Sequence, residues 1–79
     1  MSDHLAKEAA RLKADDMFNL ALDLIRSEAL NALASADADD KTMILRLQQS
    51  VASVDEIRAT LDRYVMAAGS AQETASPYA

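Results

Sequence analysis

Residues 17–33 read MFNLALDLIRSEALNAL and predict an amphipathic helix with a wide apolar side. One stripe at helical spacing consists of Phe18, Leu22, Ile25, Ala29 and Leu33. Met17, Ala21 and Leu24 widen this stripe to roughly 180°, whereas a surface helix needs an apolar arc of about 100°. A single antiparallel neighbour cannot cover so wide a face. We therefore expect part of it to bind another protein.

A second long helix is predicted over residues 40–68. Its apolar residues recur in steps of three and four: Ile44, Leu47, Val51, Val54, Leu61, Val65 and Ala68. Arg58 interrupts this series, and the neighbouring Ile57 is expected to supply the missing apolar contact. Gly69 is expected at the position after the helix end, where a left-handed conformation closes a helix without a Cβ penalty.

The residues before position 16 favour a separate short helix, because Leu5, Ala9 and Leu12 share one face. On one continuous helix, Leu5 and Leu12 would fall on the polar side of the segment that follows. This mismatch favours a break near Asp15 and Asp16, since aspartate suits the start of a helix. The alternative is a single unbroken helix with two exposed leucines.

The fold class predicted from these segments is all-α. It is an antiparallel helical hairpin (16–35 and 40–68) with a short N-terminal helix and an extended C-terminal tail. Residues 1–69 form the one helical domain, and residues 70–79 form the polar tail. One glycine and one proline in 79 residues leave almost no turn chemistry for a β architecture. A core of this size is marginal without disulfides, metal or association, and the chain has no cysteine.

The charge and hydropathy pattern predict which partners the chain has. A formal net charge of −5 with scattered Lys and Arg argues against direct nucleic-acid binding. No apolar run is long enough to span a bilayer, and the N-terminus does not read as a secretory signal. We therefore expect a protein that is cytoplasmic at synthesis and that does not bind a membrane. Its expected partners are proteins, either further copies of itself or the subunits of a larger assembly.

The most chemistry-like segment is ASADADDKTM, residues 34–43. A calcium loop that starts at Asp37 would place Lys41 and Gln48 at ligand positions, and too few oxygens would remain. We expect a turn whose aspartates cap the next helix. His4 is the only histidine and is expected to be solvated.

No catalytic residue, metal ligand, cofactor or small-molecule substrate is predicted, and the chain is not expected to be an enzyme. Asp55 and Asp62 are spaced for one side of a helix, as paired carboxylates would be. Arg58 and Arg63 sit among them, so a solvated, salt-linked face is the expected arrangement.

The candidate partner-binding residues are Met17, Phe18, Ala21, Leu24, Ile25, Gln48 and Tyr78. The first five belong to the wide apolar face. Gln48 lies beside the stripe of the last helix, where it is expected to bond across a seam between subunits, and Tyr78 is the candidate anchor of the tail. Two interpretations of Met17, Met43 and Met66 remain open: they fill gaps in the core, which is the expected role, or they form a flexible binding surface, because methionine adapts to irregular partners.

The pattern resembles a group of small helical proteins encoded in tailed-phage and prophage genomes, among structural and packaging genes. The resemblance spans residues 16–70. It rests on the spacing of the apolar residues from Phe18 to Leu33, the acidic turn 37–40, and the segment ILRLQQSVASVDEIRATLDRYV. It implies a non-enzymatic virion or assembly component, with the virion as the alternative location, and it assigns no functional residues.

The function predicted from the sequence is that of a structural or assembly protein that acts through helix–helix contacts, as in a head, portal or head–tail accessory subunit of a virion. The alternative is a small regulatory adaptor or antitoxin-like protein that binds one target helix in a groove. Both hypotheses depend on the surplus apolar surface of residues 17–33.

Overall fold

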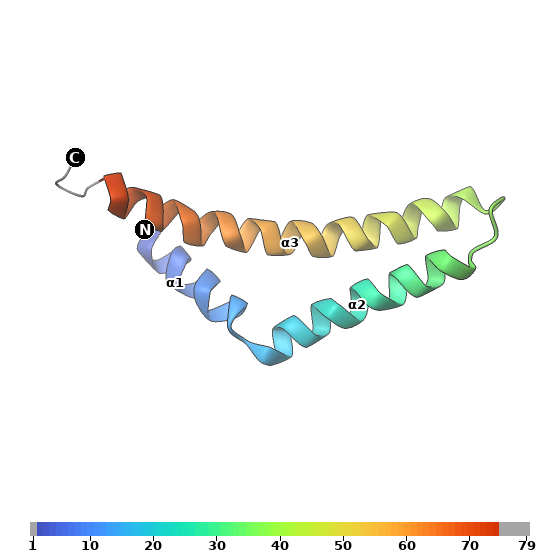
Figure 1. The fold of residues 1–79 in the computed structure, drawn as a ribbon, viewed down its shortest axis with the longest axis horizontal. Coiled ribbons are helices and arrows are strands. Elements are labelled where there is room, and N and C mark those ends of the chain that lie inside the picture. Colours follow the sequence, from blue (N-terminus) through green and yellow to red (C-terminus); the bar gives the residue numbers. More distant parts are fainter. Residues whose placement is uncertain (1, 75–79) are drawn as a thin grey trace.

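The computed structural model describes the backbone of residues 2–74 and the side chains of residues 3–67. It contains three helices: α1 (Ser2–Lys13), α2 (Asp16–Ser35) and α3 (Lys41–Thr74). The described part of the chain has no strand, and the predicted all-α hairpin with a short first helix is confirmed (Figure 1).

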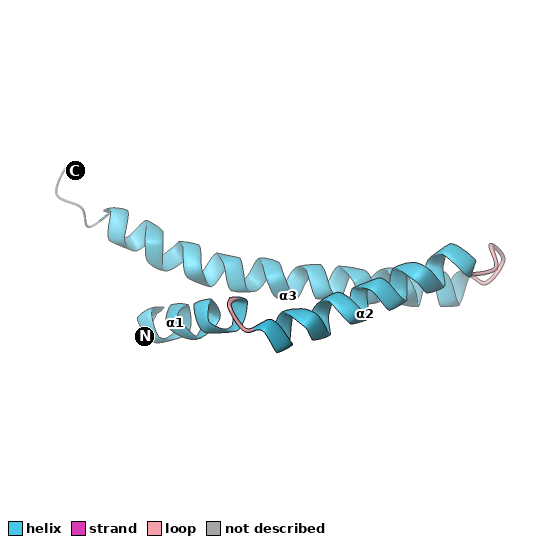
Figure 2. Ribbon diagram, turned by 60° about the horizontal axis from the view of Figure 1, so that its bottom comes forward, coloured by secondary structure: helices cyan, strands magenta, loops and turns pink. Residues whose placement is uncertain are grey.

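Helices α1 and α2 follow one another along α3 and run antiparallel to it (Figures 1 and 2). The lengths explain this arrangement. At 1.5 Å per residue, helices of 12 and 20 residues span about 18 and 30 Å, and the 34 residues of α3 span about 51 Å. Helix α1 packs mainly on α3 and barely touches α2. Every helix in this elongated structure therefore keeps one side open to solvent.

The predicted break between the first two helices is confirmed at Asp15. Its backbone is extended, and its carboxylate accepts a hydrogen bond from the Phe18 N–H at 2.9 Å, which is the geometry of an N-cap. The side chain of Asn19 donates to the Lys13 carbonyl at 2.8 Å and so satisfies one free acceptor at the end of α1. The break turns both helices so that each packs on α3.

The acidic connection between α2 and α3 is a capping turn, as predicted. Asp37 Oδ1 accepts from the Asp39 N–H at 3.0 Å, and Asp40 Oδ1 accepts from the Met43 N–H at 3.1 Å. The carboxylates are thus used by the local backbone. Among the described residues, no group of three or more histidines and carboxylates is arranged to hold a metal ion.

The predicted end of the last helix was wrong. Gly69 lies inside α3, which continues to Thr74. A glycine within a helix costs only about 1 kcal/mol relative to alanine, and the residues that follow include good helix formers such as Ala71, Gln72 and Glu73. Glycine permits a helix to end but does not force it to.

The buried core of the described residues is thin and made mostly of small side chains: Ala6, Ala9, Leu22, Ala29 and Val54. Leu5 was expected to face inward but is 40% exposed, and Ala6 is buried in its place. The expectation that three methionines fill core gaps was also wrong, because Met17, Met43 and Met66 are all exposed. Because the structure is only two helices thick, few positions lie far enough from solvent to bury a large side chain.

Candidate functional site

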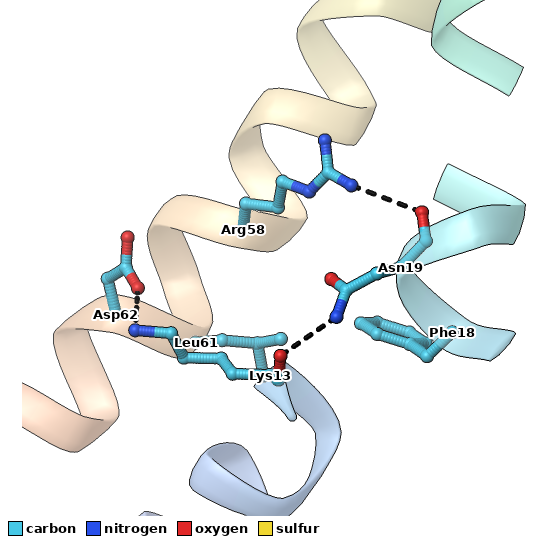
Figure 3. Close-up of a pocket in the computed structure, with 6 residues that line it drawn as sticks. All are labelled: Lys13, Phe18, Asn19, Arg58, Leu61 and Asp62. Atoms are coloured by element: carbon cyan, nitrogen blue, oxygen red, sulfur yellow. Dashed lines mark hydrogen bonds and ion pairs between the residues drawn. The ribbon is translucent and has the colours of Figure 1, made fainter. Parts of the chain in front are cut away.

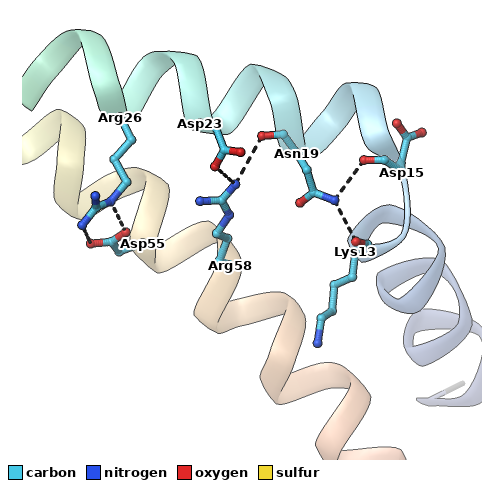
Figure 4. Close-up of polar contacts among 7 residues, drawn as sticks. All are labelled: Lys13, Asp15, Asn19, Asp23, Arg26, Asp55 and Arg58. Atoms are coloured by element: carbon cyan, nitrogen blue, oxygen red, sulfur yellow. Dashed lines mark hydrogen bonds and ion pairs between the residues drawn. The ribbon is translucent and has the colours of Figure 1, made fainter.

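The seam between α2 and α3 has two unlike flanks. One flank is polar, and two ion pairs cross the seam there: Asp23–Arg58 and Arg26–Asp55 (Figure 4). A third ion pair, Lys13–Asp62, joins α1 to α3. The other flank is an apolar groove. Each of the two helices has one polar and one apolar edge beside the seam. On the polar side of the hairpin the charged groups pair with each other, whereas on the apolar side hydrophobic side chains remain exposed to solvent.

The centre of the polar flank is Arg58. Its Nη2 donates to Asp23 Oδ1 at 2.6 Å and to the Asn19 carbonyl oxygen at 3.3 Å. We expected Ile57 to replace Arg58 at the interface, but Ile57 is 42% exposed while the Arg58 side chain is only 33% exposed. The aliphatic stem of arginine can line an apolar seam while its guanidinium reaches polar partners at the edge.

The network extends from Arg58 to the junction of all three helices (Figure 3). The Asn19 side chain bonds both the Lys13 and the Asp15 carbonyl oxygens, at 2.8 and 3.0 Å. Lys13 Nζ lies 2.5 Å from Asp62 Oδ1 on α3. These residues and Leu61 surround a small pocket of about 230 Å³, which Phe18 also lines. Both cations at the pocket are already paired with carboxylates.

Two of the ion pairs, Arg26–Asp55 and Arg63–Glu56, shift the pKa of one of their members. The hydrogen bond from Arg26 to Asp55, at 2.9 Å, raises the pKa of Arg26 above its ordinary value. The hydrogen bond from Arg63, at 2.9 Å, lowers the pKa of Glu56. Because the pKa of Glu56 is depressed, the contribution of this pair is present at neutral pH and is lost as the pH falls through its folded-state value.

The predicted salt-linked face exists, but its partners differ from those expected. Asp55 and Asp62 do not pair with the arginines of their own helix. Asp55 binds Arg26 of α2, and Asp62 binds Lys13 of α1. Spacing along one helix cannot reveal this, because the partners come from the helices packed beside it.

The apolar flank is a groove of about 340 Å³ between α2 and α3. Leu22 and Val54 form its buried floor, whereas Ile25 and Ile57 are 48% and 42% exposed on its walls. Its remaining lining residues are Arg46, Gln49, Ser50 and Ser53. The groove is therefore apolar at depth and polar along the α3 edge.

Beside the groove, α2 exposes a second apolar surface, which we call the outer face. It consists of Met17, Leu20, Ala21, Leu24 and Ile25. Met17 is 70% exposed and Leu24 is 51% exposed. Residues at steps of three, four and seven share one side of a helix, so these side chains form a continuous strip. Large exposed apolar patches mark interaction sites.

The structure brings together four of the seven predicted partner-binding residues on the outer face: Met17, Ala21, Leu24 and Ile25. Phe18 is half-buried at the three-helix junction. Gln48 is exposed on α3 but does not line the groove, whereas Gln49 does. Tyr78 lies outside the described residues.

Sequence reasoning missed Leu20, which is 49% exposed on the outer face. Its position three residues after Met17 and four before Leu24 was the available signal. It also missed Asn19, whose junction role has no sequence signal because its partners are backbone carbonyls and a residue 39 positions away.

Comparison of the chain with protein-family models, curated proteins and solved structures gives no match. Within the part of the chain that the structure describes, no helix is both long and apolar enough to cross a bilayer.

Replacing Arg58 with methionine tests the polar flank. Methionine keeps much of the aliphatic stem but removes the hydrogen bonds to Asp23 and Asn19. The free energy of unfolding, measured by urea denaturation, should therefore fall by about 1 kcal/mol. Arg46→Met is the matched control, because Arg46 is exposed and has no ion pair among the described residues. Equal losses in the two variants would contradict a specific role for Arg58.

Proposed function

We propose that this chain is a non-enzymatic structural or assembly protein that acts by packing the outer face of α2 against helices of a larger complex. The observation that carries the proposal is the exposure of Met17, Leu20 and Leu24 on one side of a single helix. Covering such a strip removes several large apolar side chains from water, and each contributes on the order of 1 kcal/mol.

The contrast between the two flanks supports the same function. Ion pairs already satisfy the polar flank, with Arg58 and Arg26 both bonded to carboxylates across the seam. The groove and the outer face meet at Ile25, so the unsatisfied surface is continuous around α2. A partner helix that packs there completes a core that is thin in the single chain.

A tailed-phage virion, with the chain as a head, portal or head–tail accessory subunit, is the setting that the resemblance implies. The second candidate is an adaptor that binds one target helix. The groove between Ile25 and Ile57 favours it, because helix-in-groove recognition needs an apolar floor with a polar rim.

Stoichiometry tests the proposal and separates the two candidates. A tagged chain is expressed in its native source, its complex is isolated, and the number of copies is measured by quantitative mass spectrometry and by light scattering. Many symmetric copies in one particle are expected for a structural subunit, and one or two copies for an adaptor. A chain that stays monomeric and cooperatively folded, with no partner, would contradict both.

A further inference from the structure

Helix α2 has four charged residues: Asp16, Asp23, Arg26 and Glu28. Asp23 and Arg26 bridge to α3 on the polar flank. Asp16 and Glu28 are exposed, and neither has an ion-pair partner among the described residues. The unpaired charge of α2 is therefore entirely negative.

These two carboxylates lie at the two ends of the outer face. Glu28 follows Leu24 by four residues and Ala21 by seven, so it occupies the place of the next apolar residue in the strip. Asp16, in the first turn of α2, precedes Leu20 by four residues, so it flanks the strip at its N-terminal end. Twelve residues separate the two acids, which corresponds to about 18 Å along the helix.

Two copies of the chain paired through their outer faces fit this pattern poorly. If two α2 helices paired in parallel, Glu28 would face Glu28 of the other copy. If they paired antiparallel about Ala21, Glu28 would lie within one turn of Asp15 and Asp16 of the other copy. Both orientations place carboxylates against carboxylates, and like charges across an interface are repulsive. Arg26, the only cation on α2, is already bonded to Asp55.

We propose that the outer face of α2 binds an amphipathic helix of another protein, and that this helix carries Lys or Arg at both ends of its apolar stripe. The inference rests on the proposed function and specifies the chemistry of the partner. The apolar residues of the two helices pack together, while cations about 18 Å apart on the partner pair with Asp16 and Glu28.

Two designed helical peptides test the inference against the full chain by isothermal titration calorimetry. Both carry the same leucine stripe, and one has lysines at its ends where the other has glutamates. The lysine peptide is expected to bind about tenfold more tightly, because two exposed attractions replace two repulsions. This advantage should shrink strongly in roughly 0.5 M salt, where exposed charges are screened.

The variant Glu28→Lys tests whether the preference for the lysine peptide arises at the outer face. It should remove or reverse that preference. Asp39→Lys is the matched control, because it makes the same change of net charge at an exposed residue of the α2–α3 connection, away from the outer face. This control should leave most of the preference intact.

Equal affinity for the two peptides, binding of neither, or a preference that Glu28→Lys does not alter would overturn the inference. The proposed function would still stand if the chain enters its native complex through the outer face, as judged by loss of assembly in Leu24→Asp. If Leu24→Asp leaves the native complex unchanged, the proposed function fails as well.

Discussion

Val54→Asp is expected to abolish the folded state at neutral pH. Val54 is 2% exposed and is the only large side chain among the described residues that is fully buried. An unpaired carboxylate placed there costs several kcal/mol, whereas a domain of this size has a total stability on the order of 5 kcal/mol. Circular dichroism during urea denaturation should show that the cooperative transition is lost.

Lowering the pH offers a second check on this variant. The buried carboxyl is less costly when it is protonated, so some helical signal should return at a pH below about 4. Ala52→Asp is the matched control, since Ala52 is exposed on the same helix and should tolerate the change within about 0.5 kcal/mol. A stable, cooperatively folding Val54→Asp would mean that α2 and α3 do not pack as described.

Leu24→Asp is expected to prevent assembly while the chain remains folded. Leu24 is 51% exposed, so an aspartate there stays hydrated in the single chain. In the complex the same carboxylate would be buried without a partner, at a cost of about 3 kcal/mol, which is more than a hundredfold in affinity. Gel filtration with light scattering should show the free chain, with helicity retained by circular dichroism.

Leu30→Asp is the control for this prediction. Leu30 belongs to the same helix and is 42% exposed, but it lies outside the outer face. The same substitution there should leave assembly within a few-fold of the parent chain. If Leu24→Asp instead unfolds the chain, or if the two variants lose assembly equally, the outer face is not the binding surface.

The positions of the helices could be predicted because their signals are local. Helix α2 occupies the predicted range, since Asp15 caps it with its own side chain and the apolar spacing continues to Leu33. The acidic turn was also predictable, because Asp37 and Asp40 bond N–H groups two and three residues away. The end of α3 was not, because one glycine is a weak stop signal when helix-forming residues follow.

The sequence also predicted that α2 has more apolar surface than the hairpin can bury. A 180° arc on residues 17–33 exceeds what one neighbour can bury, whichever way that neighbour packs. The identity of the exposed residues was only partly predictable. Phe18 is turned into the three-helix junction, while Leu20 is left on the outer face.

The amino-acid sequence alone therefore specified the helices, their caps, the break at Asp15 and the excess of apolar side chains. These features depend on interactions between residues within about one helical turn of each other. The tertiary structure decided that Arg58 enters the seam, that Asp62 pairs with Lys13, and that Asp16 and Glu28 keep unpaired charges at the ends of the outer face. The physical reason is that an ion pair or a buried contact depends on which helix lies opposite. Three amphipathic segments of this chain do not specify their mutual rotation until they pack.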